Sequence, residues 1–334
     1  MTRIMIVGEA FDSASEESGK PFAGAAGHLL FGALRRNGID PAECIITCAF
    51  NERPPAGDTD NLFTNSQPDA APNTPLFAPR TWLHSRYAHH LAALNTLRLD
   101  VKPNVILALG DIALWALTYQ RGIRAARGAP TVSFDGKTKI IPSYAPAAVV
   151  RQFDLYPIFL SDIRKTLAQS VFPELRRPSR IIHHTPSLLD IERFYHKHIA
   201  PAPYISADIE TAAGQITEVG FAPSASRALV IPFFSRSAPK GNYWPTLEQE
   251  LTAWSWVRRV LAEKPLIGQN FQYDMSYLYG IMGLPCPGFI GDTMLLAHSM
   301  EPEMEKSLGF LGSIHTSEPQ WKFMRRESNK REDS

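Results

Sequence analysis

The feature that most constrains the fold is the alternation of short apolar runs with amphipathic segments over the first 150 residues. The apolar runs are typical of buried strands, and leucines at helical spacing between them indicate helices. The expected strands lie at 3–8, 44–50, 104–110 and 137–146, and the expected helices at 26–38, 85–99 and 111–120. Strands that alternate with helices predict an α/β domain with a mainly parallel sheet.

The second half of the chain follows a different pattern. A strand expected at Pro203–Ala222 is followed directly by another at 227–234, which predicts an antiparallel meander before the chain returns to helices. Those helices are expected at 247–263, 271–283 and 292–301. A break rich in Pro and Arg separates the halves. We therefore expect a first domain at 1–170, a linker at 171–179 and a second domain at 180–334.

Composition excludes several classes of protein. The net charge of +1 over 334 residues gives no overall basic field for nucleic acid. The three cysteines form no metal-binding pattern, and free thiols without a disulfide framework fit a cytoplasmic location, the host cytoplasm if the protein is phage-encoded. We expect no signal peptide and no membrane partner, because no apolar run is long enough to cross a bilayer.

Two acids stand out in the second half. Asp208 and Glu210 are two residues apart in an expected strand, so their side chains share one face. Asn270 follows a short strand, and Asp274 lies one turn into the next helix. Paired carboxylates favour a divalent cation, and such a cluster suits two-metal phosphodiester hydrolysis. The alternative from spacing alone is a solvent-facing edge pair beside an ordinary helix cap.

The surrounding motifs extend this hypothesis. "DIET", "ITEVGFA", "IGQNFQYDMSYL" and "DTMLL" resemble the proofreading 3′–5′ exonuclease domain of family A DNA polymerases, especially phage ones, over about Arg180 to Lys322. The resemblance implies a ribonuclease-H-like fold. It also implies a DNA-binding Asn270, a helix-capping Asp292, and Mg²⁺ or Mn²⁺ at the catalytic residues Asp208, Glu210 and Asp274.

One element of that family is missing from this sequence. No tyrosine-and-aspartate motif with a fourth carboxylate follows the "EPQWK" segment. We therefore expect the exonuclease-like domain to be incomplete at its C-terminus. A separately encoded DNA polymerase fragment is the partner that this expectation implies.

A Gly-rich segment, "GEAFDSASEESGKPFAGAAGHLL", follows the first strand. Glycines before a helix let backbone N–H groups approach a phosphate or a base, although a tight turn without a ligand is the alternative. With "TCAFNERPPAGD", "LALGDIALWAL", "IRAARG" and "SYAPAAVVRQ", the segment resembles family 4 uracil-DNA glycosylases from Ile4 to Leu167. The resemblance implies a pocket for an extruded base in single-stranded DNA, near Gly8, Glu9 and Asn51, with Phe22 as the stacking ring.

The catalytic residues of that family are replaced here. Cys48 stands where the family reads uracil with Asn, and Ala145 stands where the family has a His that stabilises the leaving base. The cysteines that bind the family's iron–sulfur cluster are missing too, with Glu52 at one of their positions. We expect no iron–sulfur cluster and little uracil excision.

These patterns predict two domains: a degenerate glycosylase-like domain that binds DNA, followed by a metal-dependent 3′–5′ exonuclease. Two alternatives remain open: a non-catalytic DNA-binding or assembly subunit of a split phage DNA polymerase, and an active uracil-DNA glycosylase. Cys48 and Ala145 weigh against the second alternative.

Overall fold

The structure is a computed structural model that describes residues 3–238 and 241–318 of the chain. It divides into two compact units, and each is described by itself. The first unit runs to Arg176 and resumes at Gly309, while the second comprises the residues between. The expected second domain, 180–334, therefore extends too far. Helix α12 (Leu308–His315) packs with the first unit, because its last carbonyls are bonded by side chains from that unit.

The first unit is built on a five-stranded sheet in the order β2-β1-β5-β7-β6. The first four strands are parallel and β6 is an antiparallel edge strand, as the strand–helix alternation predicts for most of the sheet. The strands are β1 (Ile4–Ala10), β2 (Ile45–Phe50), β5 (Val105–Leu109), β6 (Thr131–Val132) and β7 (Lys139–Ser143). A separate two-stranded sheet pairs β3 (Phe63–Thr64) with β4 (Trp82–Leu83).

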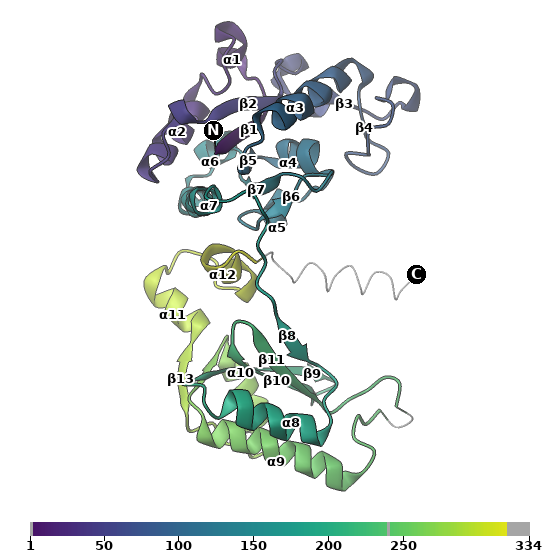
Figure 1. Cartoon of the computed structure of the whole chain (residues 1–334), viewed down its shortest axis with the longest axis vertical. Coiled ribbons are helices and arrows are strands. Elements are labelled where there is room, and N and C mark those ends of the chain that lie inside the picture. Colours follow the sequence, from purple (N-terminus) through teal and green to yellow (C-terminus); the bar gives the residue numbers. More distant parts are fainter. Residues whose placement is uncertain (1–2, 239–240, 319–334) are drawn as a thin grey trace. The chain divides into compact units, whose positions relative to one another are not determined.

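Helices cover both faces of this sheet (Figure 1). One apolar core lies between the sheet and helices α3 and α4, and another lies between the sheet and α2, α6 and α7. The helices are α1 (Ser13–Ser18), α2 (Ala25–Arg36), α3 (Ala88–Val101), α4 (Asp111–Thr118), α5 (Ile123–Ala126), α6 (Pro146–Arg151) and α7 (Tyr156–Gln169). Buried strands between two helical layers explain why each strand is almost continuously apolar.

The strand order has a topological switch point between β1 and β5. From β1 the chain passes to β2 on one side and later to β5 on the other, so the direction of winding reverses between β1 and β5. Ligands in open α/β sheets bind outside the carboxyl ends of the strands at such a reversal. The Gly-rich segment begins at this edge, at Gly8 of β1.

The second unit has a six-stranded mixed sheet in the order β13-β12-β9-β10-β11-β8. Strands β9, β10 and β11 form the expected antiparallel meander, and β12 and β13 continue the sheet in parallel. The strands are β8 (Ile181–His183), β9 (Ile205–Ala212), β10 (Gln215–Ser224), β11 (Arg227–Pro232), β12 (Leu266–Gly268) and β13 (Phe289–Asp292). This topology agrees with the expected ribonuclease-H-like fold.

The stretch Pro203–Ala222, expected as one strand, is two strands joined by a tight turn. Ala213 and Gly214 both have positive φ, 50° and 76°, which is the combination that a two-residue hairpin requires. The turn aligns Glu218 of β10 opposite Glu210 of β9. Glu218 therefore joins Asp208 and Glu210 as a third acid on the predicted face.

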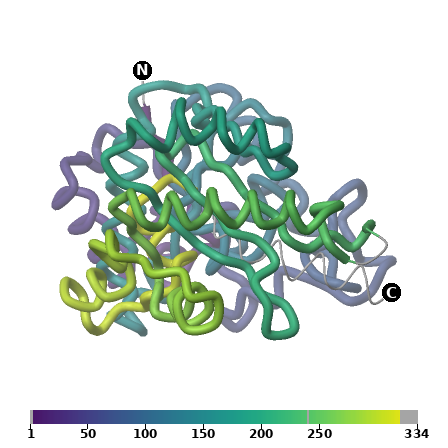
Figure 2. The backbone as a smooth tube through the Cα atoms, turned by 90° about the horizontal axis from the view of Figure 1, so that it is seen from below, coloured from purple at the N-terminus to yellow at the C-terminus, as the bar shows by residue number. Residues whose placement is uncertain are grey.

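The helices of this unit close its apolar core. They are α8 (Leu188–Phe194), continued by a π-helical turn to Ile199, α9 (Leu247–Glu263), α10 (Phe271–Leu278) and α11 (Thr293–Met300). Helices α8 and α9 lie side by side against the sheet, as Figures 1 and 2 show. Helix α10 begins directly after β12, so its first turn lies at the end of the strand that neighbours β9.

Candidate functional site

The acids of β9 lie on one face of the strand. Burial alternates along the strand, with Ile205, Ala207 and Ile209 buried and the residues between them, Asp208 included, exposed. Gly220 of β10 lies opposite Asp208 and contributes no side chain above it. The predicted face exists, and it is open beside Asp208.

Asp274 differs from these acids because it is buried. Its side chain is 3% exposed, and its Oδ1 accepts a hydrogen bond of 2.8 Å from the backbone N–H of Ile209. Burial is the main reason that the pKa of Asp274 is raised to about 7; the hydrogen bond from Ile209 lowers this pKa, and the nearby charge of Asp208 raises it. The structure therefore brings the acids of β9 and α10 together, and leaves Asp274 poised to titrate near neutral pH.

The third predicted ligand, Glu210, is two residues from Asp208 on the same face. Among the residues that the structure describes, no group of three or more His, Cys, Asp or Glu side chains is arranged to hold a metal ion. Burial raises the pKa of Glu218, and the charge of Glu210 opposite adds to this effect. Glu218 was not singled out from the sequence, and its pairing becomes evident once the hairpin register is known.

Asp292 holds the starts of two helices, α10 and α11. The carboxylate of Asp292 accepts from the N–H groups of Asn270, 3.0 Å, and Phe271, 2.7 Å, and from Met294 at the start of α11, 2.8 Å. Asp292 is thus a helix cap, as the resemblance implies. Asn270 is exposed with φ of +55°, and its side chain makes no cap hydrogen bond. Its expected role toward DNA stays a prediction.

In the first unit, the Gly-rich segment wraps Phe22 against the end of β1. A Cβ at Gly8 would lie 2.5 Å from the ring atom Cζ of Phe22, so only glycine admits this ring. Phe22 itself has φ of +60°, a strained conformation for an aromatic residue. A Cβ at Gly27 would lie 1.7 Å from the Phe22 carbonyl oxygen. Two glycines therefore make room for one half-buried ring at the carboxyl edge of the sheet.

Cys48, at the position where the family resemblance implies a base-reading Asn, is a buried thiol. Cys48 is 3% exposed, and its Sγ would lie 3.1 Å from a Cβ at Gly8. Burial raises the pKa of Cys48 to about 12, with the charges of Asp12 and Glu9 adding to the effect. The thiol is therefore protonated at neutral pH and is a weak hydrogen-bonding group.

The neighbouring polar groups are engaged in local structure. Asn51 folds back on its own strand, where its Oδ1 accepts from the Cys48 N–H at 3.1 Å. Glu9 accepts from the N–H of Ile112 at 3.1 Å at the start of α4, and burial raises the pKa of Glu9. Ala145, the N-cap residue of α6, offers no side-chain hydrogen bond. Around the expected base pocket, the side chains of Asn51 and Glu9 are thus engaged by the backbone, and Cys48 and Ala145 offer no strong hydrogen-bonding group.

An open cavity of about 600 Å³ lies beside this segment. Asn51 and Glu52 contribute to it, whereas Phe22 and Cys48 do not. Its lining is Phe11, Glu16, Gly19, Pro21, Ile46, Thr47, Asn51 and Glu52. Glu52 is also engaged by Arg86, 3.0 Å, and by His90, 3.3 Å. Where the family resemblance would place a cluster-binding cysteine, the chain has a surface ion pair.

The part of the chain that the structure describes contains no helix both long and apolar enough to cross a membrane.

The raised pKa of Asp274 predicts how the stability of the metal-free protein depends on pH. Between its ordinary pKa of 3.8 and its folded pKa of about 7, this carboxyl binds more protons in the folded chain than in the unfolded chain. The free energy of unfolding should therefore fall as pH rises through this range. The limit is about 1.4 kcal/mol per unit of pKa shift. Urea unfolding in EDTA at a series of pH values measures this loss, which Asp274→Asn should abolish.

The control for this experiment is Asp190→Asn. Hydrogen bonds from Ser187 lower the pKa of Asp190, so this acid stabilises the fold above its ordinary pKa and loses that effect as pH falls. Asp190→Asn should therefore change the pH dependence of the free energy of unfolding in the opposite direction to Asp274→Asn. An Asp274→Asn protein with the wild-type pH dependence would contradict the assignment.

Comparison with known proteins bears on the first unit. A family model described as the uracil DNA glycosylase superfamily matches residues 1–169. A type-4 uracil-DNA glycosylase of Pyrobaculum aerophilum is 30% identical over 172 residues, covering 49% of this chain and 74% of that protein. One from Thermotoga maritima is 31% identical over 168 residues, covering 49% of this chain and 76% of that protein.

A solved structure, the EXD2 exonuclease domain soaked in Mg and GMP, matches 41% of this chain and 69% of its own. The sequence identity is 16% and the TM-score is 0.26. The family match and the two relatives do identify the first unit. Through these residues, the chain belongs to the uracil DNA glycosylase superfamily.

Proposed function

We propose that this is a DNA-processing protein whose second unit hydrolyses DNA from 3′ ends with a divalent cation. The first unit binds single-stranded DNA through a glycosylase-like pocket without efficient excision of uracil. The observation that carries the nuclease proposal is the buried carboxyl of Asp274 beside Asp208, with its pKa near 7. Ionising a buried acid so close to a second acid costs free energy unless a cation balances the charge.

The residues present fit one such ion. Mg²⁺ retains several waters and is commonly bound by one or two carboxylates together with substrate phosphates. Asp208 and Asp274 provide two carboxylates, and the open position beside Gly220 leaves room for a phosphate. When bound, Mg²⁺ or Mn²⁺ would lower the pKa of a water and neutralise charge on the phosphate.

The protein's own groups account for the rest of the proposed chemistry. The Ile209 N–H fixes the carboxyl of Asp274, so this acid does not need to reorganise when a cation binds. Binding requires Asp274 to lose its proton, which is feasible near neutral pH at a pKa of about 7. Glu210, on the same face as Asp208, is the residue we propose to orient the attacking water.

The nuclease proposal predicts slow digestion of 5′-labelled single-stranded DNA from its 3′ end. The rate should be higher in Mn²⁺ than in Mg²⁺, and EDTA should abolish it. Asp208→Ala should lower the rate by at least about 100-fold, the size of effect seen when electrostatic stabilisation of a transition state is lost. Denaturing gel electrophoresis of the products measures the rate.

The matched control is Glu218→Gln, which alters a neighbouring acid outside the proposed set and should retain most of the activity. Equal digestion by wild type and Asp208→Ala would contradict the proposal. The protein would then be better described as a DNA-binding or assembly subunit, with a separate DNA polymerase chain as the partner class. The lack of a three-ligand group among the described residues is the observation that favours this second candidate.

DNA binding by the first unit is proposed from the arrangement of Gly8 and Phe22. If the ring stacks on a base, Phe22→Ala should weaken binding of oligothymidylate by about 1–3 kcal/mol. The control is Phe153→Ala, which removes a ring that is 65% exposed on the same unit but distant from the Gly-rich segment in sequence. Fluorescence anisotropy with a labelled oligonucleotide gives both affinities. An unchanged affinity for Phe22→Ala would make this ring a packing residue of the core.

Uracil excision is the activity for which the two relatives are named, so their similarity favours it as an alternative function. We propose that it is very weak here, because Cys48 and Ala145 lack the polar groups that read and stabilise the base. Removal of one such group typically costs about 100- to 1,000-fold in rate. Incubation with uracil-containing single-stranded DNA, followed by alkaline cleavage, detects abasic sites. The double variant Cys48→Asn with Ala145→His should increase the signal, and robust excision by wild type would overturn the proposal.

A further inference from the structure

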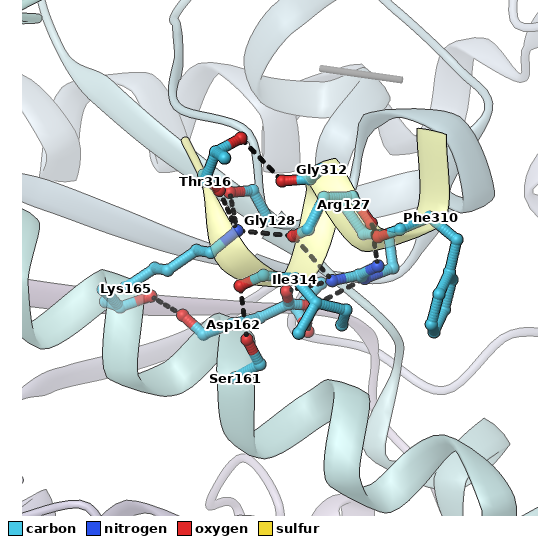
Figure 3. Close-up of polar contacts among 12 residues, drawn as sticks. Arg127, Gly128, Ser161, Asp162, Lys165, Phe310, Gly312, Ile314 and Thr316 are labelled. Carbon is cyan, nitrogen blue, oxygen red and sulfur yellow. Dashed lines mark hydrogen bonds and ion pairs between the residues drawn. The ribbon is translucent and has the colours of Figure 1, made fainter. Parts of the chain in front are cut away.

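Helix α12 ends in a buried polar cluster of the first unit (Figure 3). At its centre Arg127 and Asp162 form a bidentate ion pair. Nε of Arg127 donates to Oδ2 at 3.1 Å, and Nη2 donates to Oδ1 at 2.7 Å. The two side chains are 1% and 0% exposed. A buried pair of this kind is stable when its remaining hydrogen-bonding groups are also satisfied.

Helix α12 supplies a further hydrogen-bond partner for the Arg127 guanidinium. The hydroxyl of Ser313, which is 186 residues from Arg127 in sequence, accepts from Nη1 of Arg127 at 2.8 Å. In return, the first unit satisfies the last carbonyls of the helix. Lys165 Nζ donates to the carbonyls of Ser313 and Thr316, and the Ser161 hydroxyl donates to that of Ile314 at 3.3 Å. A positive side chain at this end also suits the helix dipole.

The close approach requires a glycine. Gly128 has φ of +73°, and a Cβ there would lie 2.6 Å from Oδ1 of Asp162 and 3.1 Å from the Ser313 carbonyl. Its N–H donates to the carbonyl of Pro142 at 2.8 Å, which ties the cluster to β7. The packing of α12 against the first unit therefore depends on a glycine at position 128.

The same cluster reaches the strand end that leads to the DNA pocket. Ser143, the last residue of β7, donates its hydroxyl to Oδ2 of Asp162 at 2.8 Å, and Ala145 follows two residues later. The Ser143 carbonyl accepts from the N–H of Gly110 at 2.9 Å. A Cβ at Gly110 would lie 2.3 Å from Cδ of Glu9, so this glycine packs against a residue expected near the proposed DNA pocket.

We infer that α12 is a positioning element for the DNA pocket of the first unit. It acts through the Arg127–Asp162 pair, which holds the end of β7 and the turn at Ala145. This inference rests on the proposed binding of single-stranded DNA by the first unit. Ser313 and Lys165 are thus positioning residues, since they act on the pocket through other groups and lie outside its wall.

The test compares two lysines that both hold backbone carbonyls in the full-length protein. Lys165→Met releases the end of α12, whereas Lys139→Met releases the carbonyls of Phe172 and Glu174 from the opposite end of β7. At a temperature where all proteins are folded, Lys165→Met should weaken binding of labelled oligothymidylate about fivefold or more. Lys139→Met should leave the affinity unchanged. Ser313→Ala, a milder change, should have an intermediate effect.

Amide hydrogen exchange provides a readout that does not depend on DNA. Exchange at residues 143–149 should be faster in Lys165→Met than in Lys139→Met. If exchange there is equal in both variants, or if both variants lose DNA affinity equally, the inference is overturned. If the wild-type protein binds no oligonucleotide, but exchange at residues 143–149 is still faster in Lys165→Met than in Lys139→Met, the proposed DNA binding is refuted. The positioning role of α12 is then retained.

Discussion

The hydrogen bond from the Ile209 N–H to the buried carboxyl of Asp274 fixes the geometry on which the second unit's proposed function depends. It joins the middle of β9 to the first helix that follows β12, and so holds one acid beside the open face that carries Asp208. The same bond favours the charged form of Asp274, while burial and the charge of Asp208 oppose it. This balance leaves the group close to half-protonated at neutral pH, where a cation can displace its proton.

The two units place their candidate groups differently. In the first unit the Gly-rich segment follows the carboxyl end of β1, whereas in the second unit Asp208 lies within β9 and Asp274 lies in the first turn of α10. In the first unit the family resemblance implies that catalytic side chains are replaced, at Cys48 and Ala145, while Gly8 and Gly27 make room for Phe22. Backbone features of this kind can preserve binding after catalytic side chains have been lost.

The sequence predicted local features well and long-range contacts poorly. The alternation of buried and exposed residues places Asp208 on one face of β9, and the α/β class follows from the order of strands and helices. The partnership of Glu218 with Glu210 depends on a hairpin register that spacing alone did not reveal. Helix α12 was assigned to the second domain because it follows it in sequence, whereas Lys165 bonds it from 151 residues away.

The central claim is that Asp208 and Asp274 bind a divalent cation with loss of the Asp274 proton. Isothermal titration calorimetry with Mn²⁺, in buffers of different ionisation enthalpy, tests it directly. The account predicts release of about one proton per ion at a pH about one unit below the pKa of Asp274, falling toward zero well above that pKa. Asp274→Asn should bind weakly and release none. Binding without a buffer-dependent heat, or equal binding by wild type and Asp274→Asn, would contradict the account.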